Sequence, residues 1–114
     1  MIKGIGCDIL SIKRIQNIVE TTPAFLKRCF SKRELERYHK QNDIAYLASR
    51  FAAKEAIVKA LSKYDHDLNT IEILNDEDGK PYVVIQNQIN HQIFVSISYE
   101  TNYVIAYAVL SSIL

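Results

Sequence analysis

The sequence is poor in cysteine, glycine and proline, and it has no tryptophan. Its 114 residues include two cysteines, three glycines and two prolines. Neither Cys7 nor Cys29 has a second cysteine at CxxC spacing, which excludes a disulfide framework and a zinc or redox site of that type. We therefore expect two reduced, partly buried thiols in a cytoplasmic protein.

Excess charge of one sign and long hydrophobic runs are missing as well. Fourteen Lys and Arg residues oppose thirteen Asp and Glu residues, for a formal net charge of +1. That balance gives no global argument for nucleic acid or an acidic membrane surface as a partner. No run of about 18 apolar residues predicts a membrane span, and the N-terminal MIKGIGCDIL lacks the pattern of a signal peptide.

The sequence does contain enough apolar material for one compact domain. It is 48% hydrophobic, so we expect one domain with a single core over residues 1–114. The patterns predict a strand at 2–10, four helices ending with a long one from 42 or 43 to about 63, and strands at 70–74, 82–86, 91–98 and 103–110. Ser11 and Ser31 are typical helix caps, and Glu34 completes a capping box with Ser31. This order predicts an α+β fold with a mainly antiparallel sheet packed on the long helix.

Asp8 stands at the end of a strand that two glycines interrupt. In an extended strand, Ile2, Gly4, Gly6, Asp8 and Leu10 share one side. Glycines in a strand often permit close approach by a ligand or another backbone, so we expect open space beside Asp8. An isolated Asp at a strand end is more commonly a turn or cap residue.

Glu55 lies in the middle of the alanine-rich stretch RFAAKEAIVKA, residues 50–60. A carboxylate among apolar helix neighbours is costly unless a cation or a metal pairs with it. Lys59 lies one turn beyond on nearly the same face, and Arg50 and Lys54 occupy an adjoining flank. A solvated Glu–Lys pair is the simpler explanation, but it does not account for the apolar face. The residues on that face are Ile44, Ala48, Phe51, Ala52 and Val58.

Asp8, Glu55 and the nearby cations suit a metal-assisted site for a phosphorylated substrate. Mg²⁺ prefers oxygen ligands, keeps several waters and often takes substrate phosphates as further ligands. Arg and Lys side chains would bind the remaining phosphate oxygens. His39, His66 and His91 are scattered and are interpreted as surface residues, and no GxSxG, P-loop or dinucleotide motif is present.

Five motifs occur in order along the chain: GIGCDI, FSKRE at 30–34, RFAAKEAIVKA, DGKP and VSIS. Together they resemble the bacterial holo-acyl-carrier-protein synthases, the small trimeric 4'-phosphopantetheinyl transferases, over essentially the whole chain. The resemblance implies the fold of that family. It also implies Mg²⁺-dependent transfer of the 4'-phosphopantetheine arm of coenzyme A to a serine of apo acyl carrier protein, for fatty acid biosynthesis. Adenosine 3',5'-bisphosphate would be the second product.

The same resemblance implies roles for individual residues. Asp8 and Glu55 would hold the metal and act with Lys59 in catalysis. The residues implied to bind coenzyme A are Arg50, Lys54, Lys59, Ser62, Ser98 and Tyr99. Tyr99 stands where members of the family commonly have histidine, and the segment SKYDHDLN at 62–69 lacks their glycine-rich loop. Both departures concern the binding of the nucleotide more than the class of reaction.

The resemblance further implies a homotrimer with active sites between subunits and an acidic carrier protein as partner. The cations expected to meet that partner are Lys13, Arg14, Lys27 and Arg28. Two other functions stay open: a non-catalytic module that docks an acidic partner through these basic helices, and a small RNA-binding domain. The near-neutral charge and the lack of an RNP-like motif argue against RNA.

Overall fold

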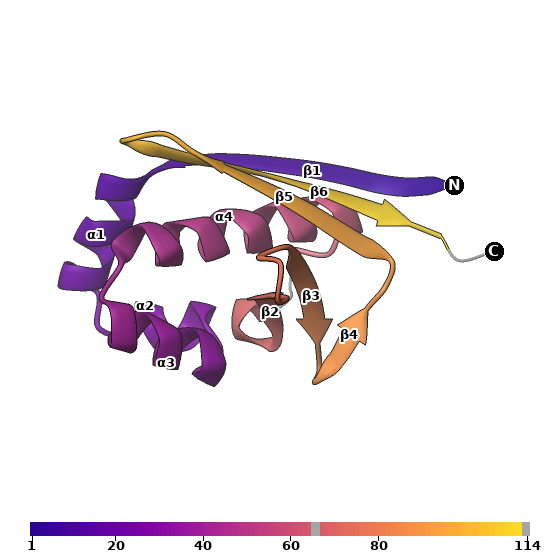
Figure 1. Cartoon of the computed structure of the whole chain (residues 1–114). Helices are drawn as coiled ribbons and strands as arrows, with labels where there is room; N and C mark the ends of the chain where they lie inside the picture. Colours follow the sequence, from indigo (N-terminus) through magenta and orange to yellow (C-terminus); the bar gives the residue numbers. More distant parts are fainter. Residues whose placement is uncertain (65–66, 113–114) are drawn as a thin grey trace.

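The computed structural model describes residues 1–64 and 67–112 (Figure 1). The chain begins with β1 (Ile2–Ser11), α1 (Ile12–Thr21), α2 (Phe25–Cys29), α3 (Lys32–Gln41) and the long α4 (Ile44–Leu61). A 3-10 turn, η1 (Leu68–Thr70), leads to β2 (Ile71–Asn75), β3 (Pro81–Ile85), β4 (Gln88–Asn90), β5 (Ile93–Tyr99) and β6 (Tyr103–Ser111). These bounds confirm the predicted α+β order.

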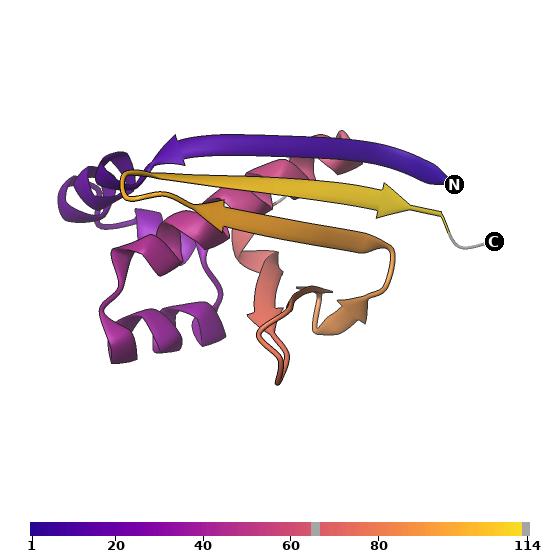
Figure 2. The same cartoon turned by 45° about the horizontal axis from the view of Figure 1, so that its top comes forward.

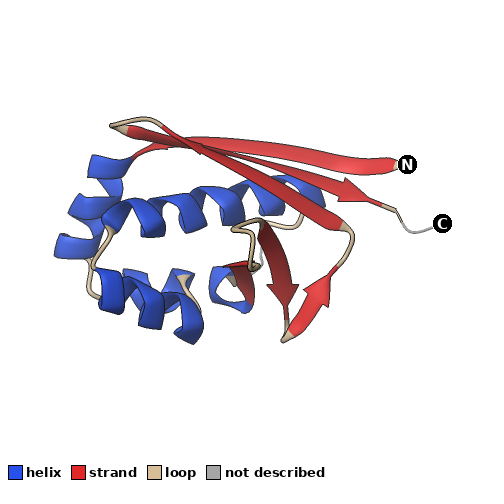
Figure 3. Ribbon diagram, viewed as in Figure 1, coloured by secondary structure: helices blue, strands red, loops and turns tan. Residues whose placement is uncertain are grey.

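The strands pair antiparallel, as predicted, but they form two small sheets rather than one. The strand order is β1–β6–β5 in the first sheet and β2–β3–β4 in the second (Figure 3). The sequence analysis missed β4, which is three residues long and follows β3 after a two-residue turn. Gln86 and Asn87 in that turn have φ angles of 53° and 64°, the left-handed conformation of a tight hairpin.

Helix α4 occupies the centre of the molecule. It lies against one face of the β1–β6–β5 sheet and has α2, α3 and the smaller sheet on its other side (Figures 1 and 2). Asp43 caps its start, because the carboxylate accepts a hydrogen bond from the amide of Ala45 at 3.0 Å. Since α4 is covered from several directions, its buried residues surround the helix instead of forming a single stripe.

Gly4 and Gly6 do not leave open space, so that part of the prediction is wrong, whereas the alternative of close approach by another backbone is confirmed. A Cβ at Gly4 would lie 2.0 Å from the carbonyl oxygen of Ala60, and one at Gly6 would lie 2.0 Å from that of Ala56. The space is filled by the backbone of α4, which only glycine allows to come this close to β1. The glycines therefore draw the Asp8 end of β1 and the Glu55 turn of α4 together.

Helix caps agree with the sequence analysis. The Ser11 hydroxyl accepts from the amide of Arg14 at 3.4 Å, which caps α1. Ser31 and Glu34 form the capping box: the Ser31 amide donates to Glu34 Oε1 at 3.0 Å, and the Glu34 amide donates to Ser31 Oγ at 3.2 Å. These local signals were readable because they involve residues only three positions apart.

The face of the β1–β6–β5 sheet that points away from α4 is apolar and open. Figure 2 shows this sheet in front of the helices. Five large side chains on it are more than half exposed: Ile5, Ile9, Phe94, Tyr103 and Tyr107. We call these five residues the open sheet face. Isolated exposed apolar residues are common, but a contiguous group on one sheet marks an interaction surface.

The cysteines and histidines differ in their exposure. Cys7 is an exposed free thiol and Cys29 a buried one. His39 and His91 are exposed, as expected, and His66 lies outside the described residues. Among the helices of the described part of the chain, none is long and apolar enough to cross a membrane.

Candidate active site

Asp8 and Glu55 line one cavity, although 46 intervening residues separate them. β1 presents Asp8 and α4 presents Glu55 to a cavity of about 280 Å³, which we call the carboxylate cavity. Arg14 of α1 and the apolar side chains of Ile15 and Phe51 also line it. The structure therefore brings together the two residues that the sequence analysis predicted as metal ligands.

Lys59 contacts Asp8 directly and acts on Glu55 from a greater distance. Lys59 donates to the backbone carbonyl of Cys7 at 2.9 Å and approaches Asp8 Oδ1 at 3.5 Å. Its side chain is 47% exposed and that of Asp8 is 20% exposed, so this is a loose ion pair. The ammonium has a third proton that neither contact uses.

Burial disfavours the ionised form of both carboxylates, and the charge of Asp8 adds to this effect at Glu55. Desolvation raises the pKa of Asp8 above its ordinary value, against the opposing influence of Lys59 and Arg14. Desolvation also raises the pKa of Glu55, and the negative charge of Asp8 raises it further. A site in which two carboxylates lack sufficient positive charge attracts a cation.

Asp8 and Glu55 fit an open magnesium site better than a metal site whose ligands all come from the protein. Within residues 1–64 and 67–112, no group of three or more His, Cys, Asp or Glu side chains is arranged to hold a metal. Mg²⁺ is commonly held by one or two carboxylates and takes its other ligands from water and substrate phosphates. Asp8 and Glu55 both offer oxygen ligands to one open cavity, which fits this mode of coordination.

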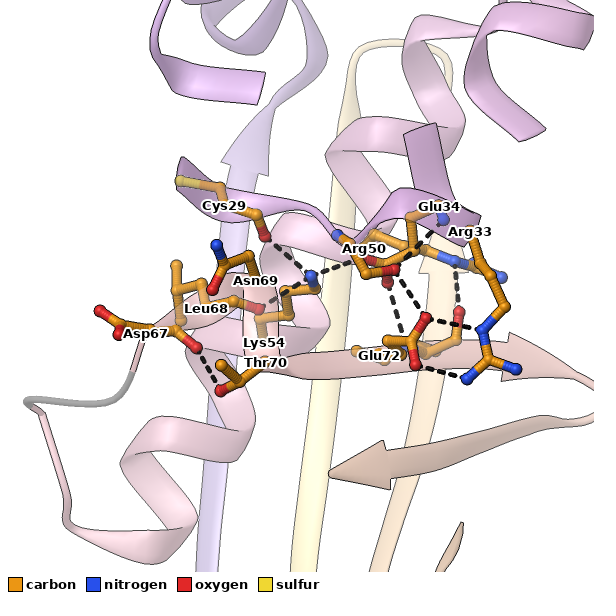
Figure 4. Close-up of polar contacts among 12 residues, drawn as sticks. Cys29, Arg33, Glu34, Arg50, Lys54, Asp67, Leu68, Asn69, Thr70 and Glu72 are labelled. Carbon is orange, nitrogen blue, oxygen red and sulfur yellow. Dashed lines mark hydrogen bonds and ion pairs between the residues drawn. The ribbon is translucent and has the colours of Figure 1, made fainter. Parts of the chain in front are cut away.

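Lys54 lies elsewhere and differs most from its predicted environment. Its side chain is fully buried, and its ammonium donates to Glu34 Oε1 at 2.5 Å, the Cys29 carbonyl at 2.7 Å and the Leu68 carbonyl at 3.0 Å (Figure 4). An ammonium has three N–H donors, so these contacts use all of them. Lys54 has no proton left for a phosphate in this arrangement, and it ties α4 to α2, α3 and η1.

Glu34 completes this buried cluster. Besides its capping bond, its second oxygen accepts from the amide of Ile73 in β2 at 3.0 Å. Next to it, Glu72 accepts from Ser31 Oγ at 2.7 Å and from Arg33 at 2.5 and 3.0 Å. The sequence analysis missed these roles. The buried neighbours of Lys54 at helical spacing, Ile57 and Val58, were the signal that it faces the interior.

Arg50 is buried but faces a second cavity. Its guanidinium donates to the Ile73 carbonyl at 3.1 Å, to Ser49 Oγ at 3.2 Å and to Asn75 Oδ1. A guanidinium carries five N–H donors, so two remain beyond these three contacts. Arg50 lines a cavity of about 390 Å³ together with Asn75, Lys80 and Tyr99, and we call it the arginine cavity.

Ser98 lies on the opposite face of the sheet from Asp8. Asp8 pairs with Ala106, which pairs with Ile97, and these three residues face α4. Ser98 is the next residue of β5, so its side chain points to the other face, where it shares a cavity with Ile9 and Tyr99. One chain therefore does not unite Asp8 and Ser98 in a single cavity.

The other predicted residues lie at the surface. Ser62 is the left-handed C-cap of α4, with φ of 55°. Lys13, Lys27 and Arg28 are exposed on α1 and α2, and Arg14 is exposed beside the carboxylate cavity. Of the basic residues predicted to meet a partner, Arg14 thus borders the site of Asp8 and Glu55, whereas Lys27 lines a separate cavity beside α3.

Comparisons with known proteins identify the family. The family model of the 4'-phosphopantetheinyl transferase superfamily matches residues 4–108. A holo-[acyl-carrier-protein] synthase of Thermodesulfovibrio yellowstonii is 41% identical over 97% of this chain and 100% of its own, and one of Halalkalibacterium halodurans is 40% identical over 96% of each chain.

Solved structures agree with the sequence matches. The holo-ACP-synthase of Plasmodium yoelii has a TM-score of 0.86 at 36% identity, covering 99% of this chain and 98% of that one. A Bacillus anthracis holo-(acyl-carrier-protein) synthase in complex with CoA (3',5'-ADP) has a TM-score of 0.85 at 30% identity, covering 98% and 99%. The motif resemblance is confirmed, and the chain belongs to the 4'-phosphopantetheinyl transferase superfamily.

Proposed function

We propose that this protein transfers the 4'-phosphopantetheine arm of coenzyme A to a serine of apo acyl carrier protein. The observation that carries the proposal is the carboxylate cavity, in which Asp8 and Glu55 meet beside Lys59. The curated relatives are holo-[acyl-carrier-protein] synthases, and a Helicobacter pylori relative was solved in complex with coenzyme A. The products are holo acyl carrier protein and adenosine 3',5'-bisphosphate, and the reaction serves fatty acid biosynthesis in the cytoplasm.

Asp8 and Glu55 would hold Mg²⁺ in this reaction. Burial raises the pKa of both carboxyl groups, and the charge of Asp8 raises that of Glu55 further, so the loose contact with Lys59 does not offset the cost of their ionised forms. A bound ion would supply charge neutralisation at the pyrophosphate of coenzyme A. The chain itself supplies Lys59, whose remaining N–H points to no described acceptor and can bind a pyrophosphate oxygen.

The nucleophile comes from the partner. The serine oxygen of the carrier protein forms a bond to the phosphorus that bears pantetheine, and the phosphoanhydride bond breaks to release adenosine 3',5'-bisphosphate. The serine proton passes to a carboxylate of the site or to water. Lys59 stabilises the negative charge that develops on the departing phosphate. Lys13, Arg14, Lys27 and Arg28 would attract the acidic carrier protein to this end of the molecule.

Arg50 and Tyr99 would bind the phosphate on the ribose of coenzyme A. Coenzyme A carries a pyrophosphate and a separate 3'-phosphate, and the described residues offer two separate groups of cations. Lys59 contacts Asp8 at the carboxylate cavity, and Arg14 lines that cavity, whereas Arg50 and Lys80 line the arginine cavity. Lys54 takes no direct part, because its three donors are used inside the protein.

A homotrimer with active sites between subunits is part of this proposal. The open sheet face gives a second copy a contiguous apolar surface to cover. Since Ser98 and Asp8 lie on opposite faces of one sheet, a site that contains both must take them from different subunits.

Intact-mass spectrometry of the carrier protein tests the proposed transfer. Purified protein, coenzyme A, Mg²⁺ and apo acyl carrier protein should give a carrier that is heavier by one phosphopantetheine arm, and EDTA should prevent the gain. No gain with several carriers would contradict the proposal. Binding of the carrier without any need for coenzyme A or Mg²⁺ would instead support the non-catalytic docking module.

A further inference from the structure

We propose that Asn75 is a positioning residue that holds the Arg50 guanidinium for the 3'-phosphate of coenzyme A. Asn75 thereby sets the preference for coenzyme A over dephospho-coenzyme A, which lacks that phosphate. The inference rests on the proposed function and adds a residue outside the recognised motifs, since Asn75 is the last residue of β2.

Two arginines converge on one amide oxygen. Asn75 Oδ1 accepts from Arg37 of α3 at 3.0 Å and from Arg50 of α4. Both guanidinium groups also contact the ring of Tyr46, with their central carbons 4.6 Å and 4.4 Å from its centroid. Tyr46 and Asn75 together fix the plane of the Arg50 guanidinium, since a stack and an in-plane acceptor leave it little freedom to rotate.

The other end of the Asn75 amide fixes the neighbouring turn. Its nitrogen donates to the Gly79 carbonyl at 2.9 Å. The same turn is held by Asp76, whose carboxylate accepts from the amides of Asp78 and Lys80, each at 2.9 Å. Asn75 therefore sets Arg50 at a fixed place relative to Lys80, the second cation of the arginine cavity.

The neutral charge of Asn75 is what makes this arrangement suit a phosphate. The lining of the arginine cavity includes Arg50 and Lys80 and has no carboxylate. If Asn75 were an acid, it would neutralise the guanidinium that it orients, and an amide orients it without cancelling its charge. Arg50 keeps two N–H donors, which is the number that a bidentate phosphate contact needs.

The substitution Asn75→Asp tests the inference, because it keeps the size of the side chain and adds a negative charge. We expect the wild type to prefer coenzyme A. In Asn75→Asp, KM for coenzyme A should rise about tenfold, in line with the loss of a hydrogen-bonded charge interaction, while KM for dephospho-coenzyme A should change less than about twofold. Asn87→Asp, in the exposed β3–β4 turn of the same sheet, is the matched control and should leave both values unchanged.

Asn75→Ala gives a second test with a smaller change, about threefold in the same ratio, since Arg50 keeps its charge but loses an orienting acceptor. Melting temperatures separate this role from a purely structural one, which would lower stability without changing the ratio. An unchanged ratio of the two KM values in folded Asn75→Asp and Asn75→Ala would overturn the inference. No transfer by the wild type would instead overturn the proposed function.

Discussion

Helix α4 carries two lysines five residues apart in opposite environments. Lys54 is fully buried, and all three of its donors meet acceptors, including the Glu34 carboxylate at 2.5 Å. Lys59 is about half exposed, lies 3.5 Å from Asp8 and keeps a free donor. The first region is closed and satisfied, whereas the second is open and has two carboxylates near one ammonium.

The difference separates structural charges from functional ones. A buried ion pair is tolerated when every donor and acceptor is used, and it then specifies how the surrounding elements pack. A site for a charged substrate needs the reverse, with charge and donors still available. By this criterion the Lys54–Glu34 cluster maintains the fold, and we propose that the Asp8–Glu55–Lys59 cluster carries the chemistry.

The largest expected effect comes from removing charge at the open cluster. Glu55→Gln should lower the transfer rate by at least about a hundredfold, since a catalytic metal supplies several kcal/mol of charge stabilisation. The melting temperature should not fall, because burial and the nearby charge of Asp8 disfavour the ionised Glu55 side chain. Activity assays and thermal melts check both statements, with Glu36→Gln on the exposed face of α3 as control. Full activity in Glu55→Gln would remove this residue from the mechanism.

The closed cluster should respond in the opposite way. Lys54→Met leaves the buried Glu34 carboxylate without its cation and should lower the free energy of unfolding by about 3–5 kcal/mol. The double variant Lys54→Met/Glu34→Gln should recover part of the loss. Urea unfolding measures both free energies.

The activity of Lys54→Met should change much less than its stability. At a temperature where Lys54→Met is folded, its transfer rate should stay within about tenfold of the wild type, a margin that allows for an indirect shift of about 1.4 kcal/mol in the barrier. Loss of activity as large as in Glu55→Gln would contradict the distinction between the two lysines.

A third substitution tests whether the cluster of Asp8, Glu55 and Lys59 needs a second copy of the chain for activity. Tyr107→Glu places a charge in the open sheet face, where Tyr107 is 55% exposed in the single chain. Desolvating that charge at an interface is costly, so the assembly should dissociate and transfer should fall with it. Sedimentation velocity measures the mass, and Gln88→Glu on β4 is the control. A trimer that persists in Tyr107→Glu would place the interface elsewhere.

The smallest effect concerns pH and stability in the metal-free protein. The pKa of Glu55 in the folded protein is raised above its ordinary value of 4.5. Its protonated form therefore contributes to the free energy of unfolding at low pH, and this contribution is lost as pH rises through the raised pKa. The melting temperature of Glu55→Gln should therefore match the wild type below pH 4.5 and exceed it by a few degrees near neutral pH. A gap that shrinks with rising pH would contradict the stated direction.

Sequence reasoning located the open cluster but not the closed one. Glu55 stood out because its apolar neighbours are close in sequence, and Asp8 because of its glycine-rich strand. The partners of Lys54 come from α2, α3 and η1, and no local pattern links those segments to position 54. The family resemblance supplied possible roles for Lys54, but it could not supply the hydrogen bonds that use its donors.

The fold, too, was predictable only where it depends on residues close together in sequence. Caps and hairpins were predictable because they depend on residues a few positions apart, such as Ser31 and Glu34. The space beside Gly4 and Gly6 was interpreted as open, because alternation along a strand says which residues share a face and not what covers it. The division into two sheets and the open sheet face likewise depend on long-range pairing.

Metal binding tests the central distinction most directly. Mn²⁺ shares the oxygen-ligand preference of Mg²⁺ and can be followed by electron paramagnetic resonance in the presence of coenzyme A. The wild type and Glu36→Gln should immobilise Mn²⁺ with similar affinity, whereas Asp8→Asn and Glu55→Gln should lose most of that binding while remaining folded. Mn²⁺ binding by Glu55→Gln with the affinity of the wild type would contradict the assignment of the open cluster as the metal site.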